Sequence, residues 1–182
     1  MHNEFININN AILIVIDVQE RSLPVLHEGE RILHNINTLI QGAEILHLET
    51  VITEQYPKGL SKTVTSLKSN EHIAIYEKDT FSCMLQSELL QQLIKTDKKD
   101  LILCGIESHI CVLKTALDAL NTGFRVHVVA DAVSSRTSEN KSLALERIRQ
   151  SGGYIVSVEM ILFMLMERAG TDTFKAISKL IK

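Results

Sequence analysis

The sequence predicts an α/β protein with a three-layer, doubly wound fold around a six-stranded parallel sheet. Six short segments of β type recur along the chain, and most of them are continuous apolar runs. Such runs are typical of strands that are buried on both faces of a parallel sheet. Between them lie segments with one apolar stripe at helical spacing. Because the two types alternate, we expect right-handed crossovers and a Rossmann-like arrangement.

The expected strands are short and rich in aliphatic residues, as buried parallel strands are. In chain order they are Ala11–Ile16, Ile45–Ile52, His72–Tyr76, Leu101–Cys104, Arg125–Ala130 and Tyr154–Val158. The longest irregular stretch, Glu54–Asn70, joins the second strand to the third. Loops of that length in compact domains are often functional.

The expected helices each place one apolar stripe against the sheet. The stripes are Ile32–Ile40, Leu85–Leu93, Leu113–Leu120 and Leu143–Ile148. The last of these begins after a possible cap at Ser138 and stops at Gly152. Two more helices are expected near the C-terminus. One is the apolar run Met160–Met166, in the core or at a subunit contact, and the other starts at a Thr171 cap.

Composition and charge restrict the class of protein. The chain has 182 residues, 45% of them hydrophobic and 23% charged, which fits one globular domain spanning residues 1–182. The net charge of −3 provides no basic surface for nucleic acid. The first ten residues lack the pattern of a secretory leader, and the longest apolar run is too short to span a bilayer. The expected location is cytoplasmic, with neither membrane nor nucleic acid as a partner.

The cysteines and histidines form no recognisable metal or cofactor site. Cys83, Cys104 and Cys111 make no CxxC pair and no zinc spacing, so neither a disulfide framework nor a structural zinc site is expected. The histidines show no ligand spacing, and the chain has no GxGxxG sequence and no P-loop. A dyad of His109 with Cys111 is not favoured, because side chains two positions apart do not face each other on a helix. We expect no cofactor, no metal and at least one free thiol.

Three reactive side chains follow strands of the expected sheet. Asp17 ends the run AILIVID, Lys78 follows HIAIYE, and Cys111 follows LILCGIESHI at the expected start of a helix. In an open parallel sheet, ligands bind in the crevice at the carboxyl ends of the strands. Together these residues would supply a base, a cation and a nucleophile. A thiol needs such a base, or a nearby cation, to react.

Each of these residues also has a structural interpretation. Asp17 could be a helix cap or an ion-pair partner, and Lys78 alone would more often be a solvated surface residue. Free cysteines are most often small buried hydrophobic residues, which is the interpretation we adopt for Cys104, while Cys83 stays open. At the start of a helix, however, the dipole would lower the pKa of the Cys111 thiol and favour its reaction.

Three segments carry a family resemblance. They are Asp17-Val18-Gln19 after the first strand, Glu77-Lys78 before Thr80-Phe81-Ser82, and the run LCGIESHICV from Leu103 to Val112. In order and spacing they resemble the isochorismatase-like cysteine hydrolases, a family that includes nicotinamidase and N-carbamoylsarcosine amidase. The resemblance covers nearly the whole chain. The segment TEQYPKGL at positions 53–60 is most similar to isochorismatase domain-containing members of unassigned substrate.

The resemblance implies a catalytic triad of Asp17, Lys78 and Cys111 on a six-stranded sheet of isochorismatase-type topology. It also implies a non-proline cis peptide between Ile106 and Glu107. The backbone N–H groups of Glu107 and Cys111 would then bind a developing oxyanion.

A small-molecule substrate and a homo-oligomer are implied as well. Gln19, Tyr56 and Phe81 are expected to border the substrate pocket, whose size would depend on the stretch Glu54–Asn70 and on a neighbouring subunit. The apolar run Met160–Met166 is compatible with such a subunit contact.

The implied activity is hydrolysis of a small amide or related C–N bond through a covalent thioester-type intermediate. A metal is not expected, because nicotinamidases carry Asp-x-His and further histidines after the second strand, whereas no histidine lies between His47 and His72. Two alternatives stay open. One is isochorismate-type hydrolysis of a vinyl ether, with Asp17 as an acid. The other is a non-catalytic oligomeric binding or scaffold protein on the same fold.

Overall fold

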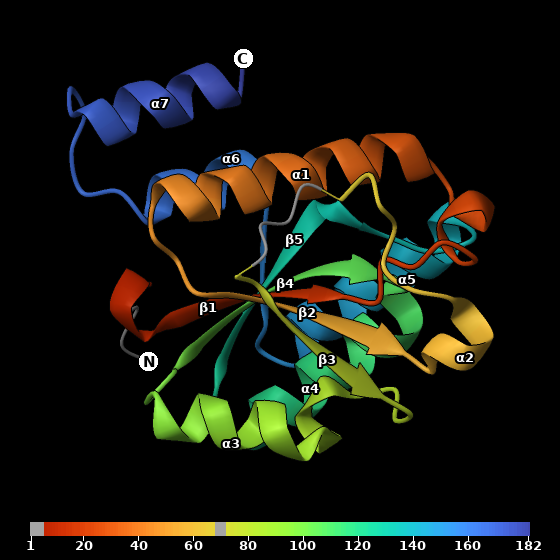
Figure 1. The fold of residues 1–182 in the computed structure, drawn as a ribbon. Helices are drawn as coiled ribbons and strands as arrows, with labels where there is room; N and C mark the ends of the chain where they lie inside the picture. Colours follow the sequence, from red (N-terminus) through yellow and green to blue (C-terminus); the bar gives the residue numbers. More distant parts are fainter. Residues whose placement is uncertain (1–5, 68–71) are drawn as a thin grey trace.

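A parallel sheet lies between two sets of helices in the computed structural model, which describes residues 6–67 and 72–182 (Figure 1). The strands are β1 (Ala11–Ile16), β2 (Thr50–Gln55), β3 (Ala74–Lys78), β4 (Asp100–Ile106), β5 (Arg125–Ser134) and β6 (Tyr154–Val156). The helices are α1 (Gly29–Ile45), α2 (Pro57–Leu60), α3 (Ser87–Lys95), α4 (Leu113–Asn121), α5 (Ser138–Gln150), α6 (Val158–Met164) and α7 (Asp172–Leu180).

The strand order is β3-β2-β1-β4-β5-β6, and every pairing is parallel. The chain starts in the middle at β1, winds outward to β3, and returns to β4 on the other side of β1. The winding direction thus reverses between β1 and β4, which is where open α/β sheets bind ligands. The doubly wound, six-stranded parallel fold expected from the sequence is confirmed.

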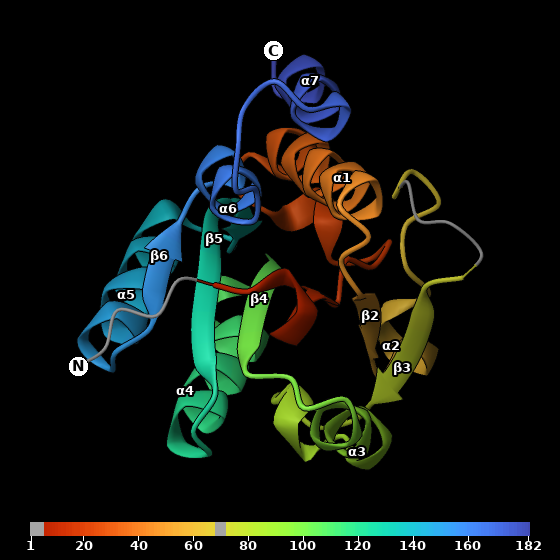
Figure 2. The same cartoon turned by 90° about the vertical axis from the view of Figure 1, so that its left-hand side faces the viewer.

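Helices cover both faces of the sheet (Figure 2). Helices α1 and α6 pack on one face, and α3, α4 and α5 pack on the other. Helix α7 lies outside α1 and contributes one fully buried side chain, Ile177. Residues of β1 alternate between the two faces and are all fully buried, which explains why the strand reads as a continuous apolar run.

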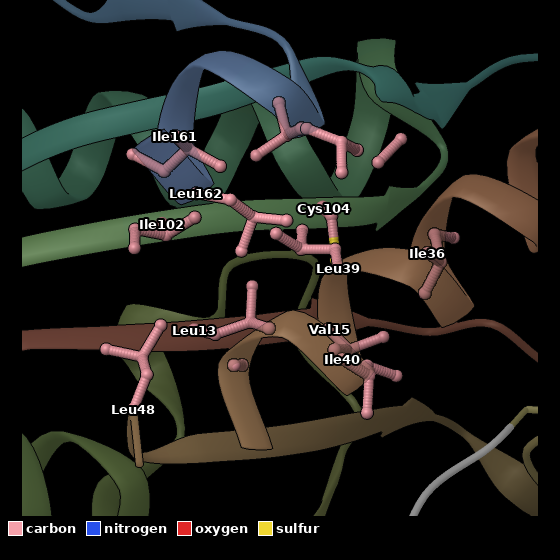
Figure 3. Packing of buried hydrophobic residues seen from close by; sticks show 14 of the residues in the cluster. Leu13, Val15, Ile36, Leu39, Ile40, Leu48, Ile102, Cys104, Ile161 and Leu162 are labelled. Carbon is pink, nitrogen blue, oxygen red and sulfur yellow. The ribbon is translucent and has the colours of Figure 1, made fainter. Parts of the chain in front are cut away.

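The core between α1, α6 and the sheet shows how these layers interlock (Figure 3). Side chains of β1 and β4 meet side chains of α1 and α6, and all of those named here are at most 2% exposed: Leu13, Val15, Ile36, Leu39, Ile40, Ile102, Cys104, Ile161 and Leu162. Cys104 is therefore the buried apolar residue that its position in the sequence predicts.

The second strand differs most from the expectation. Ile45 ends α1 instead of starting a strand, and β2 runs on through Glu54 and Gln55, which the apolar pattern assigns to an irregular stretch. A short helix, Pro57–Leu60, occupies part of that stretch, and its last residues, 68–70, lie outside the described part of the chain. The polar end of β2 is buried because neighbouring side chains bind it, a compensation that apolar periodicity does not reveal.

The helix caps agree with the expectation at one end of the chain and differ at another. Thr171 caps α7 by accepting the N–H of Phe174 at 3.0 Å. Helix α5, however, is capped by Thr137 and not by Ser138, which is its first helical residue. It ends before Gly152, whose φ of 96° only glycine adopts readily.

Strand β4 approaches β1 closely near the carboxyl edge. A Cβ atom at Gly105 would lie 2.1 Å from the carbonyl oxygen of Ile16, and the φ of Gly105 is 108°. Only glycine fits such a contact. The close approach places the chain that leads to Cys111 directly beside the residue after β1, Asp17.

Candidate active site

Asp17 lies at the carboxyl end of β1 and is 3% exposed. Its backbone turns into the left-handed region at φ 54°, and its N–H donates to the carbonyl of Thr53 on β2 at 3.1 Å. Both carboxylate oxygens accept hydrogen bonds. Oδ2 accepts from Lys78 Nζ at 2.7 Å, and Oδ1 accepts from Thr53 Oγ1 at 2.7 Å. The carboxylate is therefore buried but not left without partners.

Lys78 is the last residue of β3, and its side chain is 1% exposed. Besides Asp17, its ammonium group donates to Gln55 Oε1 at 2.6 Å and to the Thr80 carbonyl at 3.2 Å. Burial opposes the charge and is the largest single effect, but the Asp17 carboxylate, together with the sulfur atoms of Cys83 and Cys111, outweighs it and holds the pKa of Lys78 above its usual value. Lys78 is thus a fixed cation and not the solvated surface residue that lysine usually is.

Cys111 lies in a π-helical turn, Ser108–Val112, which leads from β4 into α4. The residue is 6% exposed, and its thiol lies close enough to the Asp17 carboxylate to feel its charge. Asp17, Lys78 and Cys111, which the sequence places far apart, therefore meet at one edge of the sheet.

The expected effect of a helix dipole on Cys111 is wrong. Burial raises the pKa of the Cys111 thiol, the charge of Asp17 raises it further, and Lys78 offsets only part of this. The residue precedes the first turn of α4, and it lies against a carboxylate. At rest the site therefore holds a protonated thiol, and a base must remove the proton before the sulfur can attack.

One bond in the turn between β4 and Cys111 has the geometry that the family resemblance implies: the peptide between Ile106 and Glu107 is cis. The Glu107 carbonyl accepts the N–H groups of Ile110 at 3.1 Å and Val112 at 3.2 Å. Its side-chain carboxylate binds Arg136 through Nε at 3.1 Å. These contacts hold the turn at both ends. Oxyanion binding by the N–H groups of Glu107 and Cys111 stays a prediction.

The residues expected at the pocket differ in exposure. Tyr56 and Phe81 are 57% and 56% exposed beside the carboxyl ends of β2 and β3. Gln19 is fully buried, and its amide binds backbone only, namely the carbonyls of Gln55 and Ser61 and the N–H of Gln55. In this structure Gln19 fastens the segment after β2.

A cavity of about 390 Å³ opens next to the triad. Its lining includes Tyr56, Lys78, Thr80 and Leu85, but neither Asp17 nor Cys111. The cavity thus borders Lys78 without covering the thiol. Its use by a substrate stays a prediction, as do the substrate contacts of Tyr56 and Phe81.

His109 is not a partner of the thiol in this arrangement. Its Nδ1 lies 3.0 Å from Ser135 Oγ. Three residues that the sequence did not single out belong to the cluster instead: Thr53 and Gln55, which bind Asp17 and Lys78, and Thr115, whose hydroxyl accepts the N–H of Cys83 at 3.0 Å. Thr53 and Gln55 lie where the apolar pattern of β2 has ended, so periodicity does not indicate them.

Within residues 6–67 and 72–182, no group of three or more His, Cys, Asp or Glu side chains is arranged to hold a metal ion. In the same part of the chain, no helix has both the length and the apolar character that a membrane span needs.

Comparison with known protein families gives a match to the isochorismatase domain over residues 11–160. The chain belongs to the isochorismatase family. Membership supports a hydrolase, and it confirms the family that the segments around Asp17, Lys78 and Cys111 indicate. It names neither the substrate nor the catalytic residues.

Relatives in the isochorismatase family cover nearly the whole chain. A secreted isochorismatase effector of Phytophthora sojae is 44% identical over 180 residues, which are 96% of this chain and 85% of that protein. A solved structure of the MAR1 ribonuclease from Caenorhabditis elegans is 37% identical, with a TM-score of 0.90 over 97% of this chain and 91% of that one.

A more distant structure is described as an octameric hydrolase of unknown specificity from Escherichia coli. It is 22% identical, with a TM-score of 0.88 over 96% of this chain and 89% of that one. At this identity the likeness concerns the fold alone.

Proposed function

We propose that this isochorismatase-family chain is a cysteine hydrolase that acts on a small amide or a related C–N bond. The observation that carries the proposal is the position of the Asp17 carboxylate, which binds the Lys78 ammonium at 2.7 Å and lies near the Cys111 thiol. A base, a cation and a nucleophile gathered at one end of the strands are the parts that thiol-dependent acyl transfer requires.

The first half of the proposed reaction forms a thioester. Asp17 removes the Cys111 proton as the sulfur attacks the carbonyl carbon, and the electron pair of the C=O bond moves to oxygen. The N–H groups of Glu107 and Cys111 would bind this oxyanion, and loss of one such donor typically costs about 10² to 10³ in rate. Collapse breaks the C–N bond, and the leaving nitrogen takes the proton from Asp17.

The second half returns the free enzyme. Asp17 removes a proton from water, the resulting hydroxide attacks the thioester carbon, and the C–S bond breaks. The sulfur of Cys111 regains its proton from Asp17, and the acid leaves. Lys78 keeps its charge throughout and limits the cost of charge changes at Asp17, because its ammonium is buried and has fixed acceptors.

The thiol separates this proposal from vinyl ether hydrolysis, which needs Asp17 as an acid but no nucleophile. A ribonuclease activity, as in the name of the relative from Caenorhabditis elegans, is less favoured because the net charge of −3 offers little attraction for an RNA backbone. Both reactions belong in the same screen.

The test is a screen of small amides, ureas and esters, with isochorismate and RNA added, against the wild type and Cys111→Ala. We expect turnover of an amide or urea by the wild type and none by Cys111→Ala, with Cys104→Ala as a matched thiol control that keeps activity. Stoichiometric alkylation of Cys111 should abolish turnover. Pyruvate release or RNA cleavage by Cys111→Ala would instead assign the alternative activity.

We also propose that the chain acts in the cytoplasm as a homo-oligomer. Met160, Phe163 and Met164 on α6 are between 37% and 51% exposed, and a second copy would cover such an apolar patch. Sedimentation analysis should give a mass above that of one chain. Replacement of these three residues by serine should reduce the measured mass.

A further inference from the structure

The proposed reaction leaves one buried thiol beside the triad without a role. Cys83 is fully buried at the start of the short 3₁₀ helix Cys83–Leu85. Burial, and then the charge of Asp17, raise the pKa of Cys83 to about 11. Near neutral pH it is therefore a thiol with one proton to donate.

The donor and the acceptor in the contact between Cys83 and Thr53 can be assigned. Thr53 Oγ1 lies 3.8 Å from Cys83 Sγ and 2.7 Å from Asp17 Oδ1. An ionised carboxylate only accepts, so the single hydroxyl proton of Thr53 goes to Asp17. The proton in the contact with Cys83 must then come from the thiol.

A third side chain extends the line on the far side of Cys83. The Thr115 hydroxyl also contacts the Cys83 thiol, and it accepts the Cys83 N–H at 3.0 Å. Thr115 is fully buried on α4, one turn after Cys111. The groups Thr115, Cys83 and Thr53 thus form a line that begins on the nucleophile's helix and ends on the carboxylate.

We propose that Thr53 is a positioning residue for Asp17, and that Cys83 and Thr115 hold Thr53 in place. This inference deepens the proposed function and rests on it. Lys78 binds only Oδ2 of the carboxylate, whose terminal torsion is broad when it is free. The second bond at Oδ1 fixes the plane of the carboxylate, and so the direction in which it takes a proton.

The line has no other evident use. All three of its side chains are fully buried, so none is available to a substrate or a partner protein. Polar groups in the core must be compensated to be tolerated, and here each is compensated by the next toward Asp17. An apolar residue at position 53 would pack as well but would leave Oδ1 without its hydroxyl donor, and one at position 83 would leave the Thr53 hydroxyl oxygen without the thiol.

The test uses 4-nitrophenyl acetate, an ester that acylates thiols. A burst of 4-nitrophenolate reports acylation of Cys111, and the later steady rate reports hydrolysis of the acyl-enzyme, for which Asp17 activates water. We expect Thr53→Val to slow the steady rate about tenfold, since a hydrogen bond to a charged group is lost. The acid limb of its pH profile should move to higher pH, and Thr53→Ser should restore both.

Controls separate this inference from the function on which it rests. If the ester does not acylate Cys111, or if Asp17→Asn leaves the steady rate unchanged, the proposed function fails and the inference with it. If Asp17→Asn slows the reaction but Thr53→Val moves neither rate nor pH profile, only the inference is overturned. The same holds if Thr53→Val lowers the melting temperature alone. Should Thr53→Val not fold, Cys83→Ala serves instead, and we expect it to slow the steady rate about threefold. If Cys83→Ala leaves the steady rate unchanged, the inference is overturned.

Discussion

Two buried carboxylates lie at opposite ends of the central strands: one is at the carboxyl edge of the sheet, where the strands end, and the other is at the amino edge, where they begin. Asp17, at the carboxyl edge, binds a lysine and a threonine and lies near a thiol. Asp100, at the amino edge, binds Arg125 through two hydrogen bonds of 2.7 and 2.6 Å, and His127 at 3.1 Å.

The two carboxylates differ in what their partners can give. A guanidinium does not release its proton in proteins, so the bidentate pair of Arg125 with Asp100 serves to hold β4 to β5, where the two residues pair in register. The thiol beside Asp17 can release its proton and attack. Burial and charge pairing are thus common to both carboxylates, and what distinguishes Asp17 is the neighbouring Cys111 thiol that the proposed function uses.

The largest expected effect is on catalysis at the carboxyl edge. Asp17→Asn keeps the shape of the side chain but removes the base, so hydrolysis of the acyl-enzyme should fall by about 10² to 10⁴. Mass spectrometry should then detect acetylated Cys111 after treatment with 4-nitrophenyl acetate. Asp100→Asn is the matched variant at the other edge, and a comparable fall there would contradict the division of roles.

The next effect is on stability at the amino edge. Arg125→Met leaves the fully buried Asp100 without its bidentate partner and should reduce the free energy of unfolding by about 3 kcal/mol, because breaking a buried pair strands a charge. The steady rate with the ester should stay unchanged. Urea denaturation measures the first quantity, and Arg147→Met, on the exposed side of α5, provides the control.

The smallest expected effect is on the pH dependence of stability at Asp100. Burial opposes the charge of Asp100, but the hydrogen bonds from Arg125 and His127 outweigh it and hold the pKa of Asp100 below its ordinary value. A depressed pKa adds stability above the unfolded value of about 3.9, and this is lost as the pH falls through the folded value. The stability gap between wild type and Asp100→Asn should therefore narrow on acidification. A gap that widens in acid would show that another group dominates.

Much of the site was predictable because the ends of parallel strands can be predicted from the sequence. Asp17 and Lys78 end apolar runs, and parallel strands bring their carboxyl ends to one edge whatever the details of packing. The same logic, with the family resemblance, placed Cys111 nearby. Its titration was not predictable, because the sequence does not say that a five-residue π-helical turn precedes α4 or that the thiol faces a carboxylate.

The roles of Thr53, Gln55 and Cys83 were beyond sequence reasoning for a related cause. Periodicity detects apolar residues, and the polar end of β2 therefore resembled a loop. It is a strand because Asp17 and Lys78, distant along the chain, bind its side chains. Such mutual satisfaction between distant residues leaves no local pattern in a single sequence.

The placement of Lys78 on β3 affects the order in which the site and the whole domain are lost on heating. Strand β3 is the outermost strand of the sheet, with β2 as its one neighbour. Marginal strands open locally at a lower free energy than the whole domain needs. Detachment of this one strand would carry the ammonium away from Asp17 while β2, β1, β4 and β5 stay paired. Moderate heating should therefore silence the thiol chemistry first, and circular dichroism should still report an intact sheet at that temperature.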